Sequence, residues 1–215
     1  MSAREDILAR IRRANAGAPR GAVATPHPIP AIARGAPDAL IDRFMKRAAL
    51  AGATVIRIDH LAQLPGEIAG FLEREQVPRA IAFSHESFTV LDWPAAGITA
   101  RYGPTQAEDA VSLTPAVAGI AETGSLLVAS GPGTPQLRHF LPDIHIAVLA
   151  ADRVVGGYED GWATLRADAA RMHNGVMPRA ATLITGPSRT SDIERTLQIG
   201  VHGPRRLHIV LFTSQ

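Results

Sequence analysis

Helical and strand-like patterns of apolar residues alternate along most of the chain. The first cycle predicts a helix at 38–51 that ends at Gly52, followed by the strand "ATVIRI". The same reasoning predicts, in order, a helix at 65–76, the strands "RAIAFS" and "GSLLVAS", a helix start at Thr134 and Pro135, the strand "HIAVLA", a helix at 158–172, the strand "ATLI", a short helix near 192–199 and the strand "RLHIVLF". Because several strands are continuous apolar runs, they are typical of a mostly parallel sheet covered on both faces. We therefore expect an α/β fold, with ligands beyond the carboxyl ends of the strands.

The first 36 residues differ from the rest of the chain and predict an N-terminal arm. Ser2 and Glu5 have capping-box spacing and apolar residues follow at helical spacing, so residues 2–14 are expected to form an amphipathic helix. Residues 15–36 are rich in proline, alanine and glycine without a period, which is typical of an extended linker. We therefore expect an arm at 1–36 and an α/β domain at 37–215.

Composition favours a folded, soluble, cytoplasmic protein. Apolar residues make up 46% of the chain and charged residues 20%, close to the average for globular proteins. The net charge is only +2, aromatic residues are 5% and no basic tail is present, so nucleic-acid binding is disfavoured. The N-terminus lacks the apolar core of a secretory signal, and no apolar stretch reaches about 18 residues, so no membrane span is expected.

Several chemistries are excluded by residue type or spacing. The chain has no cysteine, so it can hold neither disulfides nor thiolate-bound iron–sulfur or zinc centres. Its only lysine, Lys46, is not part of a Walker A loop, and neither a "GxSxG" elbow nor an "HExxH" motif is present. The turn "GPGTPQ" at Gly131 lacks the third glycine of the dinucleotide fingerprint and has proline where backbone donors are wanted. No histidine pair has the spacing of a helical metal site, so no metal is expected.

The segment "TGPSRTSDIE" follows an apolar strand and predicts an anion-binding loop. Ser191 and Glu194 have capping-box spacing, so a turn and a helix cap explain part of the segment. A glycine, hydroxyls, a guanidinium and the N–H groups of a helix N-terminus are also the parts that hold a carboxylate or phosphate. The candidate binding residues here are Gly186, Ser188, Arg189 and Thr190, whereas Asp192 and Glu194 fit the helix cap.

A second candidate lies in "AGIAETGSLLVAS", where apolar residues flank Glu122, Thr123, Gly124 and Ser125. One interpretation is a pair of strands turned at Gly124, with the polar side chains facing water. The other places Glu122 between buried strands, where desolvation would suit it to accept or donate a proton.

A third candidate is His202, which stands between Gly200 and Gly203 just before the final strand. A glycine-flanked histidine is often a turn residue, yet its ring could be presented to a pocket as an acid or base. His139 and His145 are weaker candidates, because a strand histidine on an apolar face is usually a core residue. The residues alone leave both interpretations open for Glu122 and for His202.

In this order, the three segments resemble the lactate-utilisation protein C family, whose members consist of a lactate-utilisation (LUD) domain. The matching pieces are "AGIAETGSLLVAS", "LPDIHIAVLAADRVV" and "TGPSRTSDIERTLQIGVHGPRRLHIVL". The resemblance covers about 108–211, and the pair "TGPSRTSDIE" and "GVHGP" is its most specific part. It implies a three-layer α/β/α sandwich with a Rossmann-like sheet, similar to glucosamine-6-phosphate isomerase, ribose-5-phosphate isomerase and CoA transferases.

The resemblance also implies a role in the oxidation of L-lactate to pyruvate, together with two partner proteins that carry iron–sulfur clusters. The absence of cysteine agrees with clusters on the partners, so no cofactor is expected on this chain, with flavin left open. The matching positions 122–125, 186–190, Asp192, Glu194 and 200–204 would form a pocket for a small carboxylate, with Gly203 among its binding residues. In such a pocket Glu122 and His202 are the candidate catalytic residues.

Two other functions stay open at this point. One is a free-standing enzyme of the isomerase, CoA-transferase or formyltetrahydrofolate cyclo-ligase-like fold, acting on a sugar phosphate, a CoA ester or a folate-type substrate. The other is a scaffolding subunit that uses the arm at 1–36 to bind partners or a second copy, as in a homo-oligomer.

Overall fold

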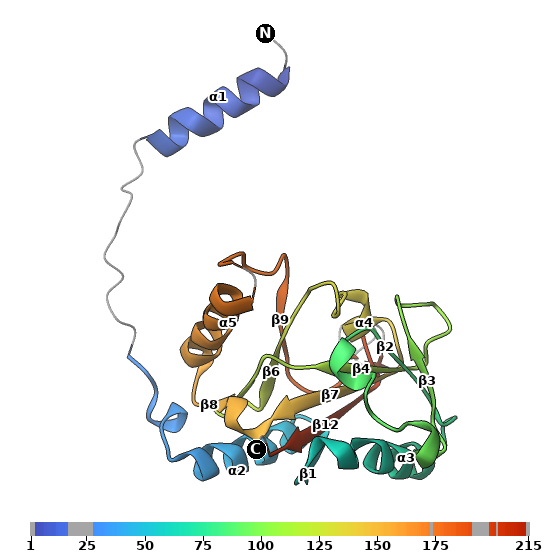
Figure 1. Cartoon of the computed structure of the whole chain (residues 1–215). Helices are drawn as coiled ribbons and strands as arrows, with labels where there is room; N and C mark the ends of the chain where they lie inside the picture. The colour runs from blue at the N-terminus through green and yellow to red at the C-terminus, as the bar shows by residue number, and fades with distance from the viewer. Residues whose placement is uncertain (1–2, 17–27, 173, 191–197, 201, 214–215) are drawn as a thin grey trace.

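The computed structural model describes residues 3–16, 28–172, 174–190, 198–200 and 202–213. Its α helices are α1 (Ala3–Ala16), α2 (Pro37–Leu50), α3 (Leu64–Arg74), α4 (Leu137–Phe140) and α5 (Tyr158–Met172). Its strands are β1 (Thr54–Ile58), β2 (Ala80–Phe83), β3 (Thr99–Tyr102), β4 (Val111–Pro115), β5 (Ala118–Ile120), β6 (Ser125–Ala129), β7 (Ile144–Ala150), β8 (Val154–Val155), β9 (Ala181–Ile184), β10 (Arg189–Thr190), β11 (Gln198–Ile199) and β12 (Arg206–Phe212). Figure 1 shows their arrangement.

The centre of the fold is a six-stranded sheet with the order β1-β12-β7-β4-β2-β3. Every neighbouring pair in it is parallel, including β1 with β12 and β12 with β7. β7 and β12 are apolar and buried along nearly their whole length, as strands covered on both faces must be. The predicted α/β fold with a mostly parallel sheet is therefore confirmed.

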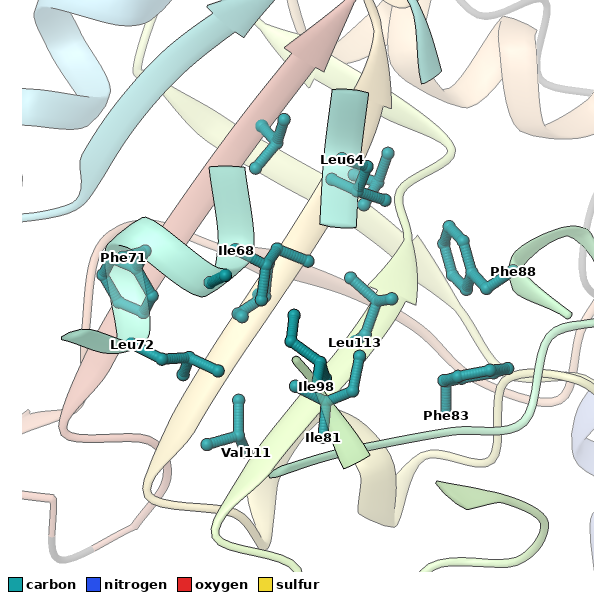
Figure 2. Packing of buried hydrophobic residues seen from close by; sticks show 14 of the residues in the cluster. Leu64, Ile68, Phe71, Leu72, Ile81, Phe83, Phe88, Ile98, Val111 and Leu113 are labelled. Carbon is teal, nitrogen blue, oxygen red and sulfur yellow. The ribbon is translucent and has the colours of Figure 1, made fainter. Parts of the chain in front are cut away.

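The two faces of this sheet belong to different cores. Side chains that alternate along β7 point to opposite sides: Ile146 lies in the core beneath α3, and Ala147 lies in the core beneath α2. Figure 2 shows the first of these cores, where apolar side chains of α3 face those of the strands. It contains Leu64, Ile68, Phe71 and Leu72 of α3 with Ile81, Val111 and Leu113. Each side chain buried in this way contributes roughly 1.5–3 kcal/mol to folding.

A second, four-stranded sheet with the order β8-β5-β6-β9 was not distinguished by the sequence patterns. β5 and β6 form an antiparallel pair turned at Gly124, as one of the two interpretations of this segment predicts. Leu126 and Val128 of β6 join the core beneath α2, whereas Leu127 meets Leu165 of α5. This sheet therefore lies between the α2 layer and α5, and the chain enters it directly from β4.

The N-terminal helix α1 stands apart from the body in Figure 1. Part of the predicted linker nevertheless contacts the domain: Ala33 is buried, and Arg43 of α2 donates to the carbonyls of Ile32 and Arg34. The division into an arm at 1–36 and a domain at 37–215 stays a prediction. Among the helices that the structure describes, none combines the length and the apolarity needed to cross a membrane.

One predicted element differs from the structure. The short helix predicted near 192–199 is wrong at its last two residues, which form β11 and pair antiparallel with β10. The pairing brings Thr190 opposite Gln198, so backbone hydrogen bonds across the pair replace those of a helix. Residues 191–197 of this prediction lie outside the described part of the chain.

Candidate functional site

The main cavity lies at the carboxyl ends of the parallel strands. It has a volume of about 980 Å³, within the range of small-molecule sites. Its floor comes from the ends of β4, β7 and β12, with Pro115, Val148 and Phe212 in the lining. Its walls come from the segments 85–88, 129–134 and 174–179 and from α5. This is where the parallel sheet is expected to bind a ligand.

A buried arginine lies behind the pocket wall that His85 begins, because it bonds to the neighbouring Ser84. Arg138 of α4 is fully buried and donates to Asp109 Oδ2 at 2.8 Å. Its second terminal nitrogen donates to Ser84 Oγ at 2.9 Å and to the carbonyl of Gly103 at 2.6 Å. Arg101 also donates to Asp109. One side chain therefore joins the loops that follow β2 and β3 to the start of β4.

The charges in this cluster support one another. Burial alone would raise the pKa of Asp109, but hydrogen bonds from Arg101 and the Gln106 N–H, with the charges of Arg101 and Arg138, lower it overall. Burial also lowers the pKa of Arg138 against the opposing effect of Asp109. An arginine stays protonated even so, so the cluster is an ion pair at neutral pH.

His85 presents a neutral ring at the pocket wall. Its Nδ1 accepts the N–H of Ser87 at 3.4 Å and lies 2.8 Å from Ser87 Oγ. Burial lowers the pKa of His85 and outweighs the opposing charge of Glu86, so the ring is neutral at pH 7. Because Nδ1 is an acceptor, the proton of the neutral ring is on Nε2, which is therefore a donor.

The turn at 131–134 approaches His85 closely. A Cβ placed on Gly133 would lie 3.2 Å from His85 Cδ2 and 3.4 Å from the carbonyl oxygen of Ser84. A side chain at this position would push the turn away from the ring, so glycine allows the close approach. The turn closes on itself through hydrogen bonds between Gly131 and Thr134 in both directions.

The opposite wall carries charged groups. Arg153 and Arg171 each donate to Asp168 at 2.6 Å. Burial acts to raise the pKa of Asp168, but the two arginines outweigh it and lower that pKa. Arg179 also lines the pocket, is exposed, and makes no ion pair within the described residues. The charged lining residues are Arg153, Arg179 and Asp168, so the lining carries a net positive charge at neutral pH.

The residues chosen from the sequence lie elsewhere, near the amino ends of β6 and β12. Ser125 is buried, and its Oγ lies 2.7 Å from Thr123 Oγ1 and 2.6 Å from Thr185 Oγ1. Through these three hydroxyl groups, the second candidate segment contacts Thr185, which directly follows β9. Gly124 has a φ of +73°, and a Cβ there would lie 2.3 Å from the Ala48 nitrogen of α2. The turn therefore packs against the backbone of α2.

The "TGPSR" and "GVHGP" segments contact each other. Ser188 N–H donates to the carbonyl of Pro204 at 2.8 Å, and Gly200 N–H donates to the carbonyl of Ser188 at 3.0 Å. His202 N–H donates to Ser188 Oγ at 3.4 Å. The Ser188 N–H that could have held an anion thus bonds within the protein.

The same loop packs on the end of α2. Gly186 has a φ of +74°, and a Cβ there would lie 2.2 Å from the Ala51 carbonyl oxygen. The Arg189 guanidinium lies against the backbone of Gly52, while the side chain as a whole is exposed. Arg189 makes no ion pair within the described part of the chain.

Glu122 points in another direction. Its N–H donates to the carbonyl of Gly156 at 3.0 Å, and its carboxylate lies toward Gly157 at the start of α5. Among the described residues, no contact joins Glu122 to His202, and Gly203 packs on Ser188. Asp192 and Glu194 lie outside the described residues.

Some of the described candidates contact one another, as Thr123 contacts Ser125 and Ser188 contacts Gly200 and His202. None of the described candidates lines the main pocket. Their proposed roles stay predictions. The residues that do line it, including His85, Arg153 and Arg179, were missed because they have no recognisable motif. Two features of the sequence could have indicated this pocket. Ligands bind at the carboxyl ends of parallel strands, and the turn "GPGTPQ" directly follows the predicted strand "GSLLVAS".

Comparison with known proteins shows the family. The LUD domain matches residues 41–212. A Lactate utilization protein C from Deinococcus radiodurans is 32% identical over 97% of this chain and 95% of its own length. A protein of the same name from Geobacillus kaustophilus is 27% identical over 83% of this chain and 80% of its own.

A solved structure supports the fold independently. The crystal structure of a DUF162 family protein from Deinococcus radiodurans matches with a TM-score of 0.61 and 22% identity, covering 83% of this chain and 99% of that one. The parallel sheet, its flanking helices and the full-length similarity agree, and the chain belongs to the LUD domain family and, within it, to the lactate utilization protein C family.

Proposed function

We propose that this chain acts in lactate utilisation as a subunit that binds a small carboxylate, together with two iron–sulfur partner proteins that carry the electrons. The observation that carries the proposal is the similarity to a Lactate utilization protein C over 97% of the chain. The absence of cysteine agrees with a division of labour in which the clusters belong to the partners.

The pocket at the carboxyl edge is the best candidate for the carboxylate site. Its net positive charge attracts an anion, and its apolar floor excludes water from the bound acid. His85 Nε2–H is suited to donate to the hydroxyl or keto oxygen of a 2-hydroxy or 2-oxo acid, because the ring is neutral and its Nδ1 is held by Ser87.

The loop at 186–190 is the alternative carboxylate site. Arg189 is exposed there and makes no ion pair within the described residues, so its guanidinium is available to an anion. In this alternative, Glu122 or His202 would handle the proton of the substrate hydroxyl. Unchanged turnover in both Glu122→Gln and His202→Ala would remove that role.

The test is lactate-dependent dye reduction by the two iron–sulfur partners, with this chain omitted or added as wild type, His85→Ala, Arg189→Ala or Arg166→Gln. Arg166 is an exposed α5 residue outside the pocket lining and serves as the control. We expect turnover to require the chain and to fall about tenfold or more in His85→Ala. A fall only in Arg189→Ala would move the site to the loop, and equal turnover without the chain would refute the proposal.

A scaffolding role is the second candidate, because α1 exposes an apolar stripe. Ile7 is 58% exposed and Ile11 51% exposed, one helical turn apart on the same face. A stripe of this kind is suited to the surface of a partner. Removing residues 1–36 should then abolish association with the partners and leave the domain folded; unchanged association would count against this role.

A further inference from the structure

The size of the main pocket points to a ligand larger than a small acid. At about 980 Å³ it lies at the upper end of the roughly 300–1,000 Å³ range of sites for drug-sized molecules. A three-carbon acid bound at His85 would leave most of this volume unfilled. Much of the remaining surface is apolar, so the missing part of the ligand has a large apolar surface.

One side of the pocket is aromatic. His85 and Phe88 follow β2, with ring centroids 6.0 Å apart, and Phe212 ends β12. The turn at Gly133 approaches the edge of the His85 ring, so the ring and the turn form one continuous wall. An aromatic side chain at the wall favours a flat ring system, because two rings can stack on or pack edge-to-face against each other.

The other side is cationic. Figure 1 shows α5 and the β2–β3 region on opposite sides of the body, and the pocket has lining residues from both. Arg153 is bonded to Asp168, whereas Arg179 makes no ion pair among the described residues. A guanidinium with unused donors on a net positive wall is suited to a phosphate, which it can bind through two parallel hydrogen bonds.

We propose that this pocket binds a nucleotide-class ligand, a flat heteroaromatic ring joined to a phosphate, with the ring at His85 and the phosphate at Arg179. Pro132 has no N–H, and the N–H groups of Gly131 and Thr134 bond within the turn, so this turn offers few donors to a phosphate. This arrangement differs from the dinucleotide fingerprint, which the sequence lacks. It leaves room beside His85 for a small acid and so deepens the proposed function, although ligand binding itself does not depend on lactate.

The test is titration of the full chain by calorimetry and thermal unfolding with FMN, NADH, AMP and CoA, with inorganic phosphate and L-lactate as comparisons. All four join a heteroaromatic ring to a phosphate. FMN carries a flavin ring, AMP and CoA carry adenine, and NADH carries adenine and nicotinamide, so their relative affinities show which ring the pocket takes. We expect at least one to raise Tm by about 5–10 °C at saturation. Arg179→Gln should weaken that ligand about tenfold or more, while Arg166→Gln should leave its Kd unchanged.

Three results would overturn the inference: no nucleotide binds, phosphate alone binds as tightly as the nucleotides, or Arg179→Gln and Arg166→Gln have equal affinity. Failure of the lactate role is distinguishable from these. A chain that binds a nucleotide through Arg179 but is dispensable for lactate-dependent dye reduction would refute the proposed function and leave the inference standing.

Discussion

Three buried histidines should make this protein unfold in mild acid. His139, His145 and His208 are each almost fully buried, and burial lowers their pKa values from 6.5 to about 4, 3 and 4. His145 Nε2 lies 2.7 Å from Thr114 Oγ1, and the His208 ring stacks on Phe71 with centroids 4.0 Å apart. Neighbouring charges add to burial for two of them: His139 lowers the pKa of His145 further, and Arg74 does the same for His208.

The sign and size of the effect follow from proton linkage. Between pH 6.5 and about 4 the unfolded chain binds a proton at each of these histidines and the folded chain does not, so stability falls as the pH falls. Each group contributes about 1.4 kcal/mol per pH unit, and the three together about 4 kcal/mol per pH unit. A domain with about 5–10 kcal/mol of stability is therefore expected to unfold about 1–2.5 pH units below 6.5.

The assay is urea unfolding of the full chain at intervals from pH 7.5 to pH 4.5, with the free energy of unfolding plotted against pH. His208→Gln should reduce the slope below pH 6 by about one third, whatever its effect on stability at pH 7. His202→Gln is the control, because this histidine is exposed and should leave the slope unchanged. A total slope near zero below pH 6, or a slope that His208→Gln leaves intact, would refute the reasoning.

Two further predictions concern stability at neutral pH. Asp109→Asn should cost about 3–5 kcal/mol, measured as a lower urea midpoint, because it leaves the buried Arg138 without an opposite charge. Arg138→Met should cost less, since Asp109 keeps Arg101, and equal losses would contradict this asymmetry. Gly124→Ala should lower Tm far more than Gly175→Ala: both have positive φ, but only the first Cβ meets the α2 backbone, so Gly175→Ala should cost about 1 kcal/mol and Gly124→Ala about 3 kcal/mol or more. Similar Tm losses for the two would show that the turn can move away from α2.

The sequence predicted the main elements of the fold because their signals are local. The helix predicted at 38–51 is α2 at Pro37–Leu50, and "HIAVLA" is within β7. The spacing of apolar residues and the glycine at 52, which ends the helix, are local features, so they determine such elements largely independently of the rest of the chain. β3 and β4 were missed because their segments lack the continuous apolar runs of β7 and β12.

The candidate site was less predictable, because its residues come together only through the topology. His85, Arg153 and Arg179 are far apart in sequence and line one pocket because parallel strands end at the same edge of the sheet. The residues in recognisable motifs, such as Gly124 and Gly186, have a packing reason instead. Gly124 approaches the backbone of α2, and Gly186 approaches the carbonyl of Ala51 just after it. A motif can therefore reflect close packing of the backbone as well as binding.

The place of β12 in the central sheet has a consequence for how the protein is made. β12 lies between β1 and β7, yet Thr54 of β1 and His208 of β12 are 154 residues apart in the chain. During synthesis, β1 and β7 therefore emerge from the ribosome before the strand that joins them, and the edge that each presents to β12 has no partner in the meantime. Such distant pairing is slow, and a nascent chain stalled before β12 would be prone to aggregation and would depend on chaperones.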